Sequence, residues 1–262
     1  MCLLVLAWRV HPRYRLIVAA NRDEYHERPA APLAEWPEPP RIIAGRDLRA
    51  GGTWLGVDRR QRFGIVTNFR EVQRPRRSAP SRGGLVPAFL AQDAPPGEFL
   101  SALEVDAPGY SGFNLLIGDG TELWYASNRA DRLARKLPPG IYGLSNQFLD
   151  TPWPKLERVR RRFTEWLRRT DVARPEELLE MLADREPAGE HETDQTVQTP
   201  GARLDPQLER ALAAPFVVHP VFGTRCSTVM LFETSGDAVV VERRFAPEGH
   251  ATGETEFRLN GA

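Results

Sequence analysis

The sequence has few cysteines and no net charge. Only two cysteines, Cys2 and Cys226, occur among 262 residues, and neither lies in a CxxC pattern or in another spacing typical of metal ligands. This scarcity excludes a disulfide framework and favours a reducing compartment. Lys and Arg together number 35, as do Asp and Glu, so the overall charge gives no indication of nucleic-acid binding.

Long apolar runs are also missing. The first run, residues 2–8, ends at Arg9 after seven residues, well short of the ~20 that a transmembrane helix needs. No basic segment precedes it, as one would in a signal peptide. We therefore expect a soluble, cytoplasmic protein without stable membrane insertion. The five histidines are scattered, and no two have metal-ligand spacing, so we expect neither a metal nor a cofactor.

The opening residues combine a cysteine with a dense polar cluster. Apolar runs on either side of residues 11–14 predict a β-hairpin, whose second strand ends beside the start of the first. This hairpin would bring four polar residues next to Cys2, namely Asn21, Arg22, Asp23 and Glu24. If Met1 is removed, Cys2 carries both a thiol and a free α-amine, so that one residue can act as nucleophile and base.

Strands and helices are predicted in a mixed order along the rest of the chain. Strands are expected at residues 54–57, 63–68, 113–118, 122–126, 140–146, 222–232 and 238–243, and helices at residues 85–90, 98–103, 153–169, 175–182 and 208–212. The helix at 153–169 has one apolar face and many arginines, which we interpret as a helix covering a sheet rather than a phosphate or membrane surface. This mixture favours antiparallel sheets with covering helices over a doubly wound parallel sheet.

The remaining segments are predicted to be irregular. The proline-rich residues 28–40 should be extended and unsuited to a central strand, and the polar tail from residue 247 should lie on the surface. Residues 188–201 are expected to form a long surface loop. A further loop, residues 71–84, carries a run of arginines that is either solvated or contacts an anionic ligand, namely Arg74, Arg76, Arg77 and Arg82.

Polar side chains at strand ends predict a site for acyl transfer around Cys2. Asn68 and Asn146 each end an apolar strand and could donate hydrogen bonds to an oxyanion. Asp23 would orient the α-amine, and Arg225 could bind a substrate carboxylate or favour the thiolate. Simpler interpretations stay open: a small apolar strand residue for Cys2, turn formers for the asparagines, and an ion-paired surface residue for Arg225.

Several motifs, taken in their order, resemble one family over essentially the whole chain. They are Met1-Cys2, Asn21-Arg22-Asp23-Glu24, residues 51–56 with Trp54, Thr67-Asn68, Leu144-Ser145-Asn146, residues 151–155 and Gly223-Thr224-Arg225. This pattern is similar to that of the NRDE-motif family, also called the transport and Golgi organisation protein 2 family. The resemblance implies a single domain over residues 1–262, related to the N-terminal nucleophile hydrolases. The implied fold is α+β, a four-layer αββα sandwich of two antiparallel sheets covered by helices.

The resemblance also implies roles for individual residues. Within the wider superfamily, the nearest chemistry looks like that of the cholylglycine hydrolase and penicillin V acylase group, which cleave linear amides. By this similarity, Cys2 matches the nucleophile, Asp23 the partner of its amine, Asn68 and Asn146 the oxyanion and amine contacts, and Arg225 a late active-site arginine. Supporting or substrate-binding residues would be Asn21, Arg22, Glu24 and Trp54. Those acylases have an arginine three residues before the aspartate, where this chain has Ala20.

Two functions follow from the resemblance. The first is an N-terminal cysteine amidohydrolase that cleaves a non-peptide C–N bond of a small molecule, with Cys2 as the nucleophile after Met1 has been removed. The second is a non-catalytic carrier of a small ligand such as haem or an acyl compound, because eukaryotic family members are implicated in haem trafficking and in lipid or acyl-CoA homeostasis. Retention of Met1 would block the α-amine and would therefore favour the carrier.

Overall fold

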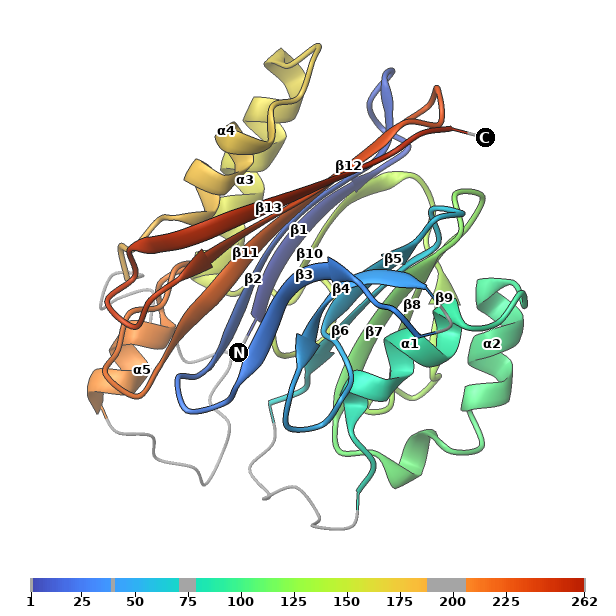
Figure 1. The fold of residues 1–262 in the computed structure, drawn as a ribbon, viewed down its shortest axis with the longest axis horizontal. Coiled ribbons are helices and arrows are strands. Elements are labelled where there is room, and N and C mark those ends of the chain that lie inside the picture. The colour runs from blue at the N-terminus through green and yellow to red at the C-terminus, as the bar shows by residue number, and fades with distance from the viewer. Residues whose placement is uncertain (1, 39–40, 71–78, 188–205, 262) are drawn as a thin grey trace. The chain divides into compact units, whose positions relative to one another are not determined.

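A computed structural model describes residues 2–38, 41–70, 79–187 and 206–261, and each of its two compact units is built on one antiparallel sheet (Figure 1). The first unit comprises Met1–Glu27, Pro139–Ser145 and Leu149–Ala262, and the second comprises Arg28–Pro138 and Asn146–Phe148. The loop predicted at residues 188–201 lies outside the described residues, as do Arg74, Arg76 and Arg77. The fourth arginine of that run, Arg82, donates a 2.9 Å hydrogen bond from Nη1 to the carbonyl of Gly112.

The first unit contains a six-stranded sheet in the order β10-β1-β2-β11-β12-β13 (Figure 1). Its strands are β1 (Cys2–Trp8), β2 (Tyr14–Tyr25), β10 (Gly140–Leu144), β11 (Phe222–Glu233), β12 (Ala238–Phe245) and β13 (Ala251–Leu259). All neighbouring strands pair antiparallel. The predicted hairpin of β1 and β2 is confirmed, and its register places Cys2 opposite Arg22.

The C-terminal tail, expected to be a surface segment, forms the edge strand β13. Most of its side chains alternate between exposed and half-buried positions. Because one side of an edge strand has no neighbouring strand, polar residues are tolerated there and the apolar pattern is weak. The sequence pattern therefore predicted a polar surface segment, but it did not predict the pairing of this segment with β12.

Three helices belong to the first unit, namely α3 (Pro154–Arg169), α4 (Pro175–Leu182) and α5 (Pro206–Leu212). Each begins with a proline, which fits the first helical position because its missing N–H has no helical acceptor there. Helix α3 packs on β1 and β10, and α4 packs on β2 and β11. Helices α3 and α4 therefore cover one face of the six-stranded sheet, as predicted for residues 153–169.

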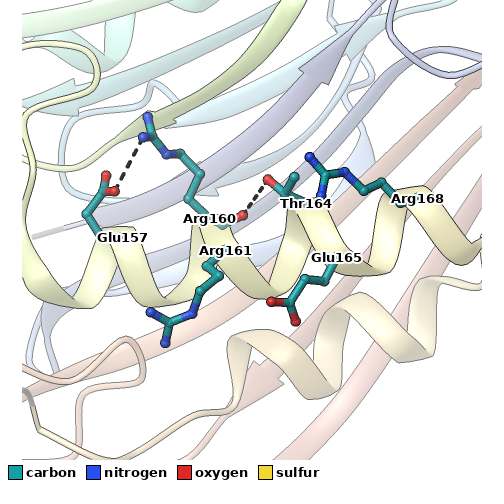
Figure 2. Close-up of a pocket in the computed structure, with 6 residues that line it drawn as sticks. All are labelled: Glu157, Arg160, Arg161, Thr164, Glu165 and Arg168. Carbon is teal, nitrogen blue, oxygen red and sulfur yellow. Dashed lines mark hydrogen bonds and ion pairs between the residues drawn. The ribbon is translucent and has the colours of Figure 1, made fainter.

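The outer face of α3 is charged and surrounds a shallow hollow of about 280 Å³ (Figure 2). The hollow is lined by Glu157, Arg160, Arg161, Thr164, Glu165 and Arg168. Arg160 forms ion pairs with Glu157 at 3.3 Å and with Asp150 at 3.2 Å. All lining residues come from one helix and both signs of charge are present, which agrees with a solvated face on an amphipathic helix.

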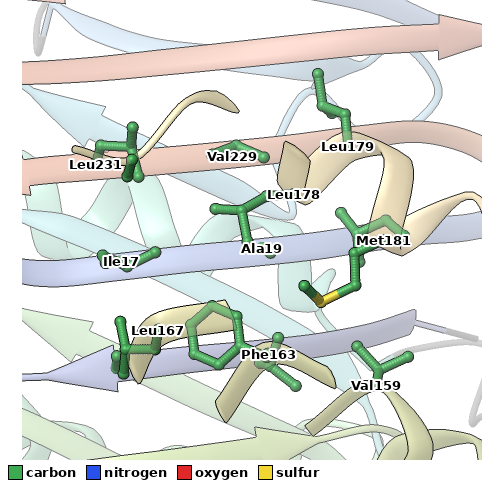
Figure 3. Packing of buried hydrophobic residues seen from close by; sticks show 14 of the residues in the cluster. Ile17, Ala19, Val159, Phe163, Leu167, Leu178, Leu179, Met181, Val229 and Leu231 are labelled. Atoms are coloured by element: carbon green, nitrogen blue, oxygen red, sulfur yellow. The ribbon is translucent and has the colours of Figure 1, made fainter. Parts of the chain in front are cut away.

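The inner face of α3 forms the centre of the core of the first unit. Leu156, Val159, Phe163 and Leu167 are buried, as predicted, whereas Trp166 is only partly buried. They pack with α4 and with sheet residues, among them Ile17, Ala19, Leu178, Leu179, Met181, Val229 and Leu231 (Figure 3). Full burial of such a side chain contributes about 1.5–3 kcal/mol, so this face fixes α3 on the sheet.

The second unit contains a seven-stranded sheet in the order β3-β4-β5-β6-β7-β8-β9. Its strands are β3 (Ala30–Glu35), β4 (Ile42–Asp47), β5 (Leu55–Asp58), β6 (Phe63–Asn68), β7 (Phe113–Gly118), β8 (Leu123–Ser127) and β9 (Ala134–Lys136). Helix α1 (Leu85–Leu90) packs on β5, β6 and β7, and α2 (Pro96–Leu103) packs on β8 and β9. Short 3₁₀ turns η1 (Arg82–Gly84) and η2 (Ala107–Gly109) flank these helices.

The structure of this sheet explains a proline-rich segment and a conformationally required glycine in its sequence. The proline-rich segment predicted to be extended forms the edge strand β3, and its pairing with β4 is irregular between Ala31 and Ala34, around Pro32. An edge position suits proline, which cannot donate to a ladder. Position 52 requires glycine because the backbone of Gly83 lies very close to it. A Cβ at position 52 would lie 2.2 Å from the carbonyl oxygen of Gly83.

Each unit thus supplies one antiparallel sheet and one layer of helices. The predicted α+β class, with two antiparallel sheets covered by helices, is confirmed. Among the helices of the described ranges, none is long and apolar enough to cross a membrane.

Candidate functional site

Strand geometry divides the polar cluster of β2 between the two faces of the sheet. Successive side chains of a strand point to opposite faces, and Ile17 and Ala19 belong to the core under α3 and α4. Asn21 and Asp23 therefore lie on this helix-covered face. Arg22 lies on the other face, which it shares with Cys2, its direct partner across the hairpin.

Asn21 joins β2 to the end of α4 and to β11. Its side-chain amide donates to the carbonyls of Leu182, at 3.0 Å, and Pro215, at 2.9 Å. Its carbonyl oxygen accepts a 2.6 Å hydrogen bond from Ser227 Oγ. The side chain is 1% exposed. Asn21 therefore supports the site by fixing the position of the strand that carries Asp23.

Asp23 is a buried carboxyl held by a hydroxyl group. It is 3% exposed, and its Oδ1 accepts a 2.7 Å hydrogen bond from Thr224 Oγ1. Burial raises the pKa of Asp23 above its ordinary value, against the lowering effects of Lys155, the Thr224 hydrogen bond and Arg22. Burial thus disfavours the ionised form of this carboxyl, whereas the neighbouring groups favour it.

Cys2 begins the inner strand β1 and is half-buried. Its carbonyl accepts a 2.9 Å hydrogen bond from Ser145 Oγ, which holds the start of the strand. Burial raises the pKa of the Cys2 thiol, and the charge of Asp23 also raises it, whereas the backbone N–H of Asp23 and the guanidinium of Arg22 lower it. Burial and the charge of Asp23 therefore oppose ionisation of the thiol, whereas the N–H of Asp23 and the guanidinium of Arg22 favour it.

Arg22 is a buried guanidinium between two thiols. It lies opposite Cys2 on β1 and opposite Cys226 on β11, and it is 5% exposed. Its Nη2 lies 3.8 Å from Oε2 of Glu24, which shares its face of β2. Positions 20 and 22 of a strand point to the same face. The guanidinium of Arg22 therefore lies on the same face of the sheet as an arginine at position 20 would, which is where the acylases have their arginine.

The second cysteine, Cys226, is buried on β11, with 4% exposed. Burial raises the pKa of its thiol well above the ordinary value, and Glu242 raises it further. Both cysteines are free. Since β2 lies between their strands, their Cα atoms are about 10 Å apart, too far for a disulfide. Cys226 is therefore a small buried residue of the strand.

Arg225 lies at a β-bulge between Thr224 and Cys226. Its Nη1 donates to the carbonyls of Tyr25, at 3.0 Å, and His26, at 3.2 Å. Burial and the neighbouring charge of Arg22 lower the pKa of Arg225, but a guanidinium keeps its charge in proteins. These contacts fix the end of β2, and binding of a substrate carboxylate by Arg225 stays a prediction.

Asn68, Asn146 and Trp54 belong to the second unit. The side-chain amide of Asn146, which is 1% exposed, donates a 2.8 Å hydrogen bond to the carbonyl of Asn68. The carbonyl of Asn146 in turn accepts from the N–H of Arg70 at 2.6 Å, and that of Trp54 accepts from Val66 at 2.8 Å. The structure therefore brings the two asparagines together, and their role as oxyanion donors stays a prediction.

Sequence reasoning assigned no role to Thr224 or Lys155. Thr224 Oγ1 donates to Asp23 and also accepts from the N–H of Val217 at 2.9 Å. Lys155, in the first turn of α3, is 4% exposed, and its Nζ donates a 2.8 Å hydrogen bond to the carbonyl of Leu212. A cation in the first turn of a helix is unusual because the helix dipole opposes it, and this was the one signal available in the sequence.

The described part of the chain contains no group of three or more His, Cys, Asp or Glu side chains that could hold a metal ion. The candidate site in the first unit consists instead of a thiol, a guanidinium and a carboxyl on adjacent strands. Such a set can perform nucleophilic and acid–base chemistry or bind a polar ligand.

Two antiparallel sheets with covering helices, and an Asn-Arg-Asp-Glu strand end beside Cys2, define an α+β protein of the NRDE class. The family model described as Transport and Golgi organisation 2 matches residues 1–247, and the chain belongs to this family. It is 34% identical to the Transport and Golgi organization protein 2 homolog of Bos taurus and 32% identical to that of Homo sapiens, each over 275 residues and 99% of both chains. The Transport and Golgi organization protein 2 of Drosophila melanogaster is 28% identical over 62% of this chain and 64% of its own.

Proposed function

We propose that this protein is a cytoplasmic N-terminal cysteine amidohydrolase that cleaves a non-peptide amide bond of a small molecule. The observation that carries the proposal is the placement of Cys2 directly opposite the buried Arg22, next to the buried Asp23. A thiol becomes a strong nucleophile when a nearby cation favours the thiolate. An α-amine on the same residue would supply the base, once Met1 has been removed.

The first half of the reaction forms a thioester. The thiol proton passes to the α-amine of Cys2, and Sγ attacks the amide carbon of the substrate. The tetrahedral intermediate carries an oxyanion, which hydrogen-bond donors would stabilise. When the C–N bond breaks, the α-ammonium returns its proton to the leaving nitrogen, and a free amine departs.

The second half hydrolyses the thioester. Water gives a proton to the α-amine as it attacks the thioester carbon, and the C–S bond then breaks. The sulfur takes up that proton, and a carboxylic acid is released. Asp23 would orient the α-amine through both steps by accepting a hydrogen bond from it.

Mass spectrometry tests the proposal in two measurements. The intact mass should show a chain that begins at Cys2, and an acyl probe such as a reactive thioester or β-lactone should label Cys2. Cys226→Ala, which removes the buried thiol, is the matched control and should be labelled as the wild type is. Retention of Met1 by the purified protein would contradict the proposal, because no α-amine would then be available on Cys2.

A non-catalytic carrier of a small ligand is the second candidate. The observation that favours it is the combined effect of burial, which raises the pKa of both the Cys2 thiol and the Asp23 carboxyl. A thiol and a carboxyl whose ionised forms burial disfavours suit a polar binding site better than an activated nucleophile. The ligand could be haem or an acyl compound, as the family resemblance implies.

Cys2→Ala separates the two candidates. An amidohydrolase would lose acyl labelling and turnover with this substitution. A carrier would keep its affinity for haem or an acyl thioester, measured by titration of the purified variant. Loss of ligand binding in Cys2→Ala would contradict a carrier in which the thiol plays no part.

A further inference from the structure

Ser145 connects the end of β10 to the start of β1. It directly follows Leu144, the last residue of β10, and it is 2% exposed. Its Oγ donates a 2.9 Å hydrogen bond to the carbonyl of Cys2, 143 positions away in the chain. The register of β1 with β10 runs up to the pair of Leu4 and Leu144. The serine hydroxyl therefore extends the connection between these strands to Cys2, the first residue of β1.

The backbone next to Ser145 is firmly held. The N–H of Gly143 donates to Oδ1 of Asp150, and the N–H of Asp150 donates to the carbonyl of Gly143, each at 2.8 Å. The carboxyl of Asp150 also lies 3.2 Å from Nη1 of Arg160 on α3, which packs on β10. A hydrogen bond orders its acceptor only when its donor is itself held in place. The end of β10 thus presents the hydroxyl of Ser145 from a fixed position.

This hydrogen bond acts on the peptide group that follows the Cα of Cys2. The carbonyl of Cys2 and the N–H of Leu3 belong to one planar peptide group. An anchor on the carbonyl oxygen therefore restricts the whole plane, including the direction of the bond to the Cα of Cys2. The first residues of a chain are poorly ordered unless such contacts hold them. The need is greatest in a chain that begins at Cys2, because no residue then precedes the thiol and the α-amine.

We propose that Ser145 is a positioning residue that anchors the carbonyl of Cys2 and thereby fixes the orientation of the thiol and the α-amine. The catalytic consequence rests on the proposed function, whereas the anchoring itself does not. Arg22 of β2 pairs with Cys2 from the other side of β1, so the two contacts hold Cys2 between β2 and the end of β10. Displacement of a reacting group by about 1 Å can slow an enzyme about 100-fold. Loss of this anchor should therefore slow the reaction of Cys2 measurably.

Two substitutions of Ser145 and a matched control isolate this contact. Ser145→Ala removes the hydroxyl, and Ser145→Thr keeps it. Ser127→Ala is the control, because Ser127 is fully buried in the second unit and its Oγ donates a 3.1 Å hydrogen bond to the carbonyl of Phe113. Both alanine variants thus lose a buried hydrogen bond from a serine to a carbonyl, but only Ser145→Ala loses it at Cys2.

Nitrogen-15 relaxation of the Leu3 N–H measures the anchoring and needs no activity. We expect the order parameter of this N–H to fall from about 0.85, the value of a rigid backbone, to below about 0.7 in Ser145→Ala. The wild-type value should return in Ser145→Thr and should persist in Ser127→Ala. An unchanged order parameter in Ser145→Ala overturns the proposal. Failure of Ser145→Ala to fold also overturns it, because the hydroxyl would then serve the fold as a whole.

The rate at which an acyl probe labels Cys2 tests the catalytic consequence. With a β-lactone probe, the maximal labelling rate should fall about fivefold or more in Ser145→Ala, whereas the half-saturating probe concentration should change by less than about twofold. Ser145→Thr should restore most of the rate, and Ser127→Ala should react as the wild type does. Equal slowing in the two alanine variants overturns the proposal, since a general loss of stability would then explain it.

The two measurements together distinguish this inference from the proposed function. A lowered order parameter of Leu3 together with slower labelling in Ser145→Ala supports both. A lowered order parameter in a protein that is never labelled supports the anchoring and contradicts the hydrolase. Labelling that is as fast in Ser145→Ala as in the wild type supports the hydrolase and overturns the positioning role of Ser145.

Discussion

Thr224 Oγ1 donates a 2.7 Å hydrogen bond to Oδ1 of Asp23 across two strands whose residues are 201 positions apart in the chain. The same hydroxyl accepts a 2.9 Å hydrogen bond from the N–H of Val217. One threonine thus orders both the carboxyl of the candidate site and the segment that leads into β11. These two contacts make Thr224 a sensitive position for substitution.

Replacing Thr224 with valine keeps the shape of the side chain and removes both hydrogen bonds. We expect Thr224→Val to lower the free energy of unfolding by about 2–3 kcal/mol, because the N–H of Val217 loses its acceptor in a buried environment. Thr224→Ser is the matched control, since it keeps the hydroxyl and should cost less than about 1 kcal/mol. Urea unfolding measures both values, and equal losses for the two variants would contradict this account of Thr224.

The carboxyl of Asp23 should make stability depend on pH in a defined direction. Burial raises the pKa of Asp23 above its ordinary value of 3.8, so the native state holds this proton more tightly than the unfolded chain does. The stability that Asp23 contributes is therefore fully present below pH 3.8 and is lost as the pH rises through the raised pKa.

Asp23→Asn removes this titration. The difference in Tm, variant minus wild type, should become more positive as the pH rises from about 4 towards neutrality. Differential scanning fluorimetry across this pH range provides the measurement, and a difference that stays constant or falls with rising pH would exclude a raised pKa.

The side chain of Asn21 should matter for stability. Asn21→Ala removes two donated hydrogen bonds and one accepted hydrogen bond, and we expect a loss of about 3 kcal/mol in the free energy of unfolding. Ser227→Ala, which removes only the 2.6 Å hydrogen bond to Asn21, should cost about 1 kcal/mol. Chemical denaturation tests both variants. Similar losses for the two substitutions would show that the carbonyls of Leu182 and Pro215 do not depend on Asn21.

The two thiols should differ widely in reactivity. Iodoacetamide should modify the half-buried Cys2 of the native protein, whereas Cys226, whose pKa burial raises well above the ordinary value, should react only after unfolding. Peptide mass mapping of native and urea-treated samples measures the order of labelling. Non-reducing analysis should show no link between the cysteines, because their strands are separated by β2. Rapid native labelling of Cys226 would contradict its burial.

The two faces of α3 should respond differently to truncation. Phe163 is fully buried in the core of the first unit (Figure 3), so Phe163→Ala should cost about 3–5 kcal/mol. Arg161 lies on the outer face of the same helix (Figure 2), and Arg161→Ala should change the free energy of unfolding by less than about 0.5 kcal/mol. Urea titrations of the two variants provide the comparison. A large loss in Arg161→Ala would assign the outer face a structural role.

Local periodicity accounts for most of the fold that could be predicted. The α3 and α4 helices have strong apolar faces with proline at the start, and the β1 and β2 strands are apolar runs around a short turn. Strands β3, β4, β9 and β13 were not predicted. Three of them, β3, β9 and β13, lie at sheet edges, where few apolar side chains are required.

Only the part of the candidate site that lies on the β1–β2 hairpin could be predicted from the sequence. The hairpin register brings Arg22 opposite Cys2, and this could be read from two adjacent strands. The contact of Thr224 with Asp23 depends on the pairing of β2 with β11, which no local pattern reveals. Lys155 was overlooked because lysine is almost never fully buried, and its burial follows from the packing of α3 and α5 on the sheet.

The pairing of β2 with β11 also sets the order in which the site can form. The β1–β2 hairpin is synthesised early, but its partner strand begins only at Phe222. Hydrogen bonds such as that between Asn21 and Ser227, 206 positions apart, require closure of a very long loop, which slows folding. Until then an apolar hairpin edge is exposed on the nascent chain, a hazard for aggregation. A chain truncated before β11 should therefore bind chaperones, even though it contains the whole Asn-Arg-Asp-Glu motif.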